Sequence, residues 1–99
     1  MKMDTKITVD TKITEVIFRK FQGEIVAMFP YFIYDRKGSV QSYVHVGQHG
    51  AADLGIIHDS KPATEIEYKP LYAELTSIGY NLKVIKRVNY KRYNKERIM

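Results

Sequence analysis

The sequence predicts an α+β fold, a small antiparallel sheet of about four strands with one helix packed on one face. The chain has 99 residues, a length that suits a single domain with one hydrophobic core. Apolar and polar residues alternate in several short stretches, as they do in strands that bury one face, whereas residues 64–78 have the spacing of an amphipathic helix. The predicted order is strand, strand, strand, helix, strand.

Residues 15–21 and 24–29 are predicted to form the first two strands, joined as a hairpin through Gln22 and Gly23. Pro30 follows the second strand. Because proline has no N–H to donate to a neighbouring strand, we expect the strand to end there or to lie at a sheet edge. Residues 31–34 continue as an apolar aromatic patch.

Residues 40–46 are predicted to form the third strand, after a turn at residues 35–38. Aliphatic side chains alternate there with polar and aromatic ones, which is typical of a strand with two different faces. Residues 47–62 form the longest stretch without a regular pattern. Loops of this length inside a compact domain are often functional.

The helix at residues 64–78 has the clearest local signals. Thr64 and Glu67 have the spacing of a capping box, which satisfies two free N–H groups at the start of a helix. Gly79 follows the last apolar position and is suited to the left-handed conformation that ends helices. Pro70 removes one backbone hydrogen bond, so we expect it to kink the helix or to begin a second helical segment.

The predicted organisation is a polar leader, weakly ordered or an edge strand, then a single α+β domain and then a basic tail, at residues 1–13, 14–90 and 91–99. The motif DTKIT occurs twice near the start of the chain, at residues 4–8 and 10–14. The last strand of the domain is predicted from the alternation of apolar residues between Leu82 and Tyr90.

No apolar run approaches the ~20 residues that a membrane-spanning helix needs, and the first residues lack the apolar centre of a signal peptide. The chain has no cysteine, which excludes disulfides and thiolate metal sites. We therefore expect a cytoplasmic protein without a membrane partner. The sequence does not determine the oligomeric state.

The net charge of +5 is concentrated near the C-terminal end. Residues 1–78 carry nine basic and ten acidic side chains, whereas residues 79–99 carry seven basic side chains and one acidic one. Such a basic segment is typical of a surface that contacts phosphates or an acidic partner. The candidate nucleic-acid-binding residues are Lys83, Lys86, Arg87, Tyr90, Lys91 and Arg92, with the cations on phosphates and the tyrosine stacked on a base. A solvated basic face without such a partner is the alternative.

Imidazole and carboxylate ligands for a metal ion are available at His45, His49, Asp53, His58 and Asp59. Their spacing brings no two of them together on a helix, so we predict no metal site. No nucleophile elbow, phosphate loop or other catalytic spacing occurs. We therefore predict a protein that is not an enzyme and needs no cofactor.

Five runs of the sequence resemble a family of small uncharacterised proteins carried by phages and mobile elements of gut bacteria: residues 16–21, 24–30, 42–53, 61–64 and 77–87. The resemblance transfers no functional residue. It implies a non-enzymatic role, such as binding nucleic acid, sequestering a nucleotide signal or blocking a host defence protein. It also implies a possible ligand loop, formed by Tyr43, His45, Gly47, His49, Gly50 and Asp53.

The sequence thus favours a non-enzymatic binding protein whose partner carries phosphate, either a nucleic acid or a nucleotide. The alternative is a protein-binding inhibitor of a host defence protein with an acidic surface. In that case the aromatic patch at residues 31–34 and the basic strand would form the contact.

Overall fold

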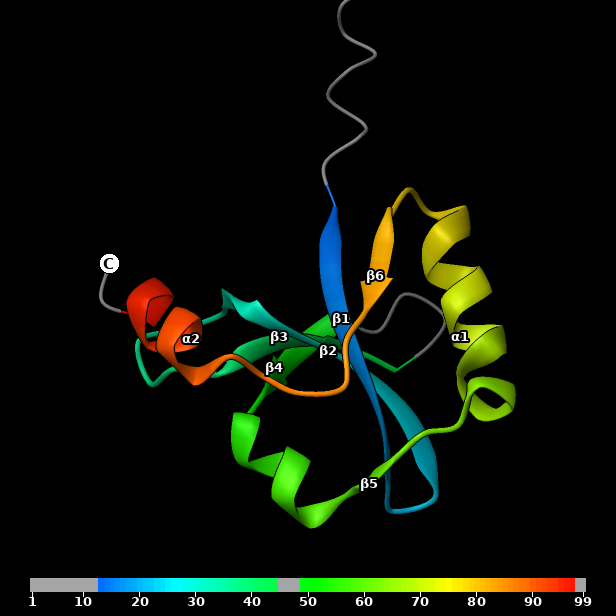
Figure 1. Ribbon diagram of the computed structural model, residues 1–99, viewed down its shortest axis with the longest axis horizontal. Coiled ribbons are helices and arrows are strands. Elements are labelled where there is room, and N and C mark those ends of the chain that lie inside the picture. Colours follow the sequence, from blue (N-terminus) through cyan, green and yellow to red (C-terminus); the bar gives the residue numbers. More distant parts are fainter. Residues whose placement is uncertain (1–12, 45–48, 98–99) are drawn as a thin grey trace, which may run out of the picture.

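The computed structural model describes residues 13–44 and 49–97, which form a sheet with helices on both faces (Figure 1). The sheet has six strands in the order β4-β3-β2-β1-β5, with β6 also paired to β1. The predicted α+β class, with a helix packed on the sheet, is confirmed. The repeated DTKIT leader, up to residue 12, lies outside the described residues.

Strands β1 (Thr14–Phe21) and β2 (Glu24–Ile33) form the predicted antiparallel hairpin. Gln22 and Gly23 have φ values of 51° and 82°, the positive values that a tight hairpin turn requires. Both alternatives predicted for Pro30 are wrong, because β2 continues to Ile33 and lies between β3 and β1 in the sheet. Its pairing with β3 shifts register between Phe29 and Ile33, so Pro30 lies where the ladder requires no N–H.

Strands β3 (Val40–Tyr43) and β4 (His49–Ala52) form a second antiparallel hairpin at the edge of the sheet. The chain then forms the 3₁₀-helix η2 (Leu54–Asp59) and the two-residue strand β5 (Lys61–Pro62). The third strand was predicted to continue to residue 46, but β3 ends at Tyr43. The prediction of an irregular stretch after it is wrong from His49 onward, because β4, η2 and β5 lie there. The sequence does not reveal β4 and β5 because they are too short to show an alternating pattern.

Helix α1 (Glu65–Ser77) begins with the predicted capping box. The Thr64 hydroxyl accepts a hydrogen bond from the Glu67 N–H at 3.2 Å, and the Glu67 carboxylate accepts one from the Thr64 N–H at 2.9 Å. The helix continues through Pro70 as one element, so no second helical segment begins there. Gly79, with φ of 113°, follows the end of the helix as predicted.

The predicted last strand is mostly wrong. Strand β6 covers only Leu82–Val84 and pairs with β1 in parallel, not antiparallel. Farther along, the same edge of β1 is occupied by β5, which pairs with Arg19 and Lys20, so β6 cannot extend there. The chain then forms helix α2 (Tyr90–Arg97) where the end of the strand and a basic tail were expected.

The two faces of the sheet carry separate apolar cores. One core joins Val16, Phe18, Ala27, Phe29 and Tyr43 of the sheet to Leu71 and Leu75 of α1. The other joins Ile17, Val26, Met28, Val40 and Ala52 to Leu54 of η2 and Tyr93 of α2. The sheet thus separates α1 from α2 (Figure 1). Within the described residues, no helix is long and apolar enough to cross a bilayer.

Candidate functional site

The basic residues between β6 and α2 are the first candidate site. Lys83 lies on β6, and Lys86 and Arg87 lie in the segment that leads from β6 to α2. Lys91 and Lys95 lie on α2 itself. All five side chains are exposed, and none forms an ion pair with a described residue. Their charges are therefore available to a partner.

Helix α2 points its lysines away from the protein because Tyr93 points inward. Tyr93 is 8% exposed, and its hydroxyl donates a hydrogen bond to the carbonyl of Gly38. Lys91 and Lys95 lie two positions before and after Tyr93, about 200° around the helix in either direction. Both lysines therefore project from the side opposite the buried tyrosine.

Arg92 was predicted to contact phosphate, but the structure places it in contacts within the protein. Its guanidinium forms an ion pair with Glu15 and lies over the ring of Tyr31, 4.0 Å from the centroid. The Tyr31 hydroxyl also accepts a hydrogen bond from the Asn89 N–H at 2.9 Å, one residue before α2. Arg92 thus holds α2 against β1 and β2.

The turn between β2 and β3 adds two cations that the sequence analysis missed. The Asp35 carboxylate accepts hydrogen bonds from the N–H groups of Lys37 and Ser39, at 3.0 and 3.1 Å, which fixes the turn. The contact of Tyr93 with Gly38 then holds this turn beside α2. Arg36 and Lys37 are exposed there. Only the fold brings them to the basic helix, so no local pattern could have revealed them.

Two exposed tyrosines flank these cations. Tyr90, at the start of α2, is 44% exposed and meets Tyr93 edge to face, and Tyr34, just before the turn, is 55% exposed. We call the whole set the basic surface, and it consists of Tyr34, Arg36, Lys37, Lys83, Lys86, Arg87, Tyr90, Lys91 and Lys95.

The described residues of the possible ligand loop do not form one site, and each makes a different contact within the protein. Tyr43 is buried and donates a hydrogen bond to Glu74, and the exposed His49 meets its ring edge to face at 4.7 Å. The His49 Nε2 atom is 3.1 Å from the Tyr80 hydroxyl.

Two further residues of the predicted loop hold the backbone. The Gly50 carbonyl accepts a hydrogen bond from Ser42 at 3.1 Å, and the Asp53 carboxylate accepts one from the Gly55 N–H at the start of η2. The structure thus brings Tyr43 and His49 together, whereas His45 and Gly47 lie outside the described residues.

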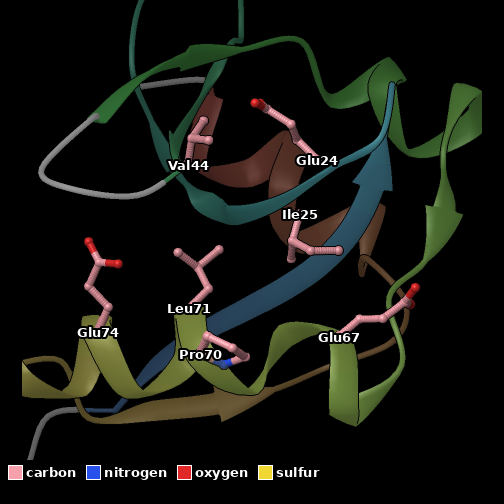
Figure 2. A pocket seen from close by; sticks show the side chains of 7 residues that line it. All are labelled: Glu24, Ile25, Val44, Glu67, Pro70, Leu71 and Glu74. Atoms are coloured by element: carbon pink, nitrogen blue, oxygen red, sulfur yellow. The ribbon is translucent and has the colours of Figure 1, made fainter.

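A groove of about 290 Å³ lies between α1 and the strands β2 and β3 (Figure 2). Its apolar lining consists of Ile25, Val44, Pro70 and Leu71, and its polar lining consists of three carboxylates, Glu24, Glu67 and Glu74. The backbone hydrogen bond from Thr64 and the contact with Lys20 lower the pKa of Glu67, so this group stays ionised. Carboxylates repel phosphate, so this groove differs from the basic surface in the charge of the ligand that it could bind.

Two other cavities are present. One of about 310 Å³ lies beside Arg92 and is partly lined by Ile13 and Phe32, and one of about 470 Å³ lies between β5 and β6. Among the residues that the structure describes, no group of three or more histidine, aspartate or glutamate side chains is placed to hold a metal ion.

Comparison of the chain with protein-family models, with curated proteins and with solved structures gives no match. Among the described residues, the basic surface contains seven exposed cationic side chains.

Proposed function

We propose that the protein binds single-stranded nucleic acid along the basic surface. The observation that carries this proposal is the set of seven exposed cations without an ion pair to a described residue, which lie on β6, on the segment between β6 and α2, on α2 and on the turn beside α2. Phosphates neutralise such cations and release counterions, which is the main source of affinity in non-specific nucleic-acid binding.

Tyr34 and Tyr90 support a single-stranded partner. Both rings are about half exposed and lie next to cations, Tyr34 before Arg36 and Tyr90 before Lys91. Unpaired bases stack on exposed aromatic rings with little sequence preference, whereas bases inside a duplex are not available for such stacking. Five of the seven cations are lysines, which are compact point charges, and contacts with phosphate carry no sequence information, so we propose binding with little sequence specificity.

The test is a fluorescence anisotropy titration of single-stranded and double-stranded DNA and RNA at low and at physiological salt. Lys91→Ala/Lys95→Ala is the test variant. Lys61→Ala/Lys69→Ala is its matched control, because these lysines are also exposed and unpaired with described residues but lie on β5 and α1. Each lost phosphate contact lowers the salt slope for single strands by about 0.7, so we expect a decrease of about 1.4 in the test variant and none in the control.

Three outcomes would contradict the proposal. Absence of binding to any strand at low salt would remove it, and equal weakening by both double variants would show that net charge acts without a defined surface. Preference for the duplex would exclude stacking by the tyrosines.

A protein-binding role remains the second proposal, since Ile13 and Phe32 are apolar and 59% and 43% exposed. Both line the cavity of about 310 Å³ next to α2, so an acidic host protein could contact apolar and basic side chains together. Phe32→Ala would then weaken capture of that partner. Binding through this apolar contact would depend on salt less steeply than nucleic-acid binding.

A further inference from the structure

A further cavity lies at one edge of β1, between the parts of that edge that pair with β5 and with β6. The Ile85 N–H donates to the Val16 carbonyl at 2.8 Å, at the end of β6, and the Ala63 N–H donates to the Phe18 carbonyl at 3.2 Å, just after β5. Between these contacts the structure encloses about 470 Å³. This volume falls within the range of roughly 300–1,000 Å³ that is typical of small-molecule sites.

Most of the lining is apolar. Ile17, Phe18, Val84 and Ile85 come from β1 and from the end of β6, and Tyr68 comes from α1. The rings of Phe18 and Tyr68 are stacked, with centroids 4.4 Å apart and an interplanar angle of 9°. A cavity with stacked rings in its lining suits the flat apolar body of a ligand.

Arg19 contributes a buried positive charge to this cavity. It is only 9% exposed, and burial lowers the pKa of its guanidinium. Its Nε donates to the Ser60 hydroxyl at 2.9 Å, and its Nη2 donates to the carbonyls of Ile57 and Ser60 at 2.9 and 2.6 Å. All of these acceptors are neutral, and no described carboxylate pairs with Arg19. A buried charge without a counterion is costly, so an anion bound in the cavity would stabilise the protein.

Lys86 adds a second cation, and Glu65 is the one acidic side chain in the lining. The lining residues therefore carry a net positive charge, in contrast to the groove beside α1 with its three carboxylates. At the start of α1, the capping box already occupies the Glu67 N–H, so this group is not available to an anion. Arg19 and Lys86 are the groups that would recognise an anion.

We propose that this cavity binds a flat organic ring system that carries a phosphate, such as a mononucleotide. The ring system packs against the apolar lining, and the phosphate contacts Arg19 and Lys86. The ligand is either a free nucleotide or the phosphorylated end of a strand, because Lys86 belongs both to the cavity and to the basic surface. The site does not depend on binding of a longer strand to α2.

The test is isothermal titration calorimetry with adenosine monophosphate, and with adenosine and inorganic phosphate as partial probes. We expect saturable binding of the nucleotide and binding at least roughly ten-fold weaker for each partial probe, because one charge-assisted contact or one buried ring accounts for about that factor. Lys86→Ala should weaken nucleotide binding by a similar factor. Lys69→Ala, on α1 and outside both the cavity and the basic surface, should leave it unchanged.

Glu65→Gln gives a test in the opposite direction. Removal of the one negative charge from the lining should tighten nucleotide binding, and weaker binding would mean that the cavity prefers a cation. No binding of the nucleotide, or equal effects of Lys69→Ala and Lys86→Ala, would also overturn the proposal. Lys91→Ala/Lys95→Ala should not change nucleotide affinity, so failure of the basic surface and failure of the cavity are distinguishable.

Two oligonucleotides separate the sources of the ligand. A short strand with a 5′-phosphate that binds more tightly than the same strand with a 5′-hydroxyl, and loses this advantage in Lys86→Ala, would assign the cavity to a strand end. Equal binding of the two strands, together with binding of the mononucleotide, would assign it to a free nucleotide.

Discussion

The two α-helices lie on opposite faces of the sheet and are stabilised in different ways. Helix α1 has a capping box, an apolar stripe and an acidic groove beside it, and it buries Leu71 and Leu75. Helix α2 has eight residues with few apolar side chains, and Tyr93 is its buried anchor. The first helix has strong local signals for its formation. The second has a local cap, since the Asn89 side chain accepts a hydrogen bond from the Arg92 N–H at 3.1 Å, but its packing on the sheet depends on contacts with distant residues. Its lysines make none of these contacts and are free for a partner.

The largest expected effect is on the core beneath α1. Leu75→Ala removes a side chain that is 0% exposed and should lower the free energy of unfolding by about 2–5 kcal/mol, as measured by urea denaturation. Ile66→Ala on the same helix is the control, because Ile66 is 87% exposed and its truncation should change stability by less than about 0.5 kcal/mol. Equal effects of the two substitutions would mean that α1 does not pack as described.

A smaller effect is expected at the anchor of α2. Tyr93→Phe keeps the ring but removes the hydrogen bond to the Gly38 carbonyl, so it should cost about 1 kcal/mol and increase hydrogen exchange in α2 and in the turn that carries Arg36 and Lys37. Tyr90→Phe is the matched control at an exposed position. Unchanged exchange in the turn would show that Tyr93 does not hold the turn and α2 together.

The smallest effect concerns the pH dependence of α1. The pKa of Glu67 is lowered in the folded protein, first by the hydrogen bond from the Thr64 backbone and then by Lys20, from an ordinary value of 4.5. An acidic group whose pKa is lower in the folded protein than in the unfolded chain stabilises the folded state at pH values above the unfolded pKa. This stabilisation is lost as the pH falls through the folded pKa. Glu67→Gln should therefore lose less stability than the wild-type protein between pH 6 and pH 3 in parallel thermal melts. An identical decrease in both proteins would remove Glu67 as a source of acid sensitivity.

Elements with local sequence signals, such as α1, were predicted correctly, whereas elements that depend on distant contacts, such as α2, were not. The capping box at Thr64, the helix end before Gly79 and the hairpin turn at Gln22 and Gly23 depend on residues a few positions apart, and all three are confirmed. Strand β4 has four residues and β5 has two, too few for a periodic pattern. The alternating apolar residues after Leu82 predict one strand, whereas in the structure that strand ends at Val84, and β5 pairs with the same edge of β1 farther along, at Arg19 and Lys20.

The sequence by itself determined the first hairpin, helix α1 with both of its ends, and the concentration of positive charge after residue 79, because each depends on neighbouring residues. The tertiary structure decided that residues 90–97 form a helix, that Arg92 serves an internal contact, and that Arg36 and Lys37 join the basic surface. It also decided that a cavity opens between β5 and β6. The physical reason is sequence separation: Arg92 contacts Glu15 across 77 positions and Tyr93 contacts Gly38 across 55, and no local pattern encodes such pairs.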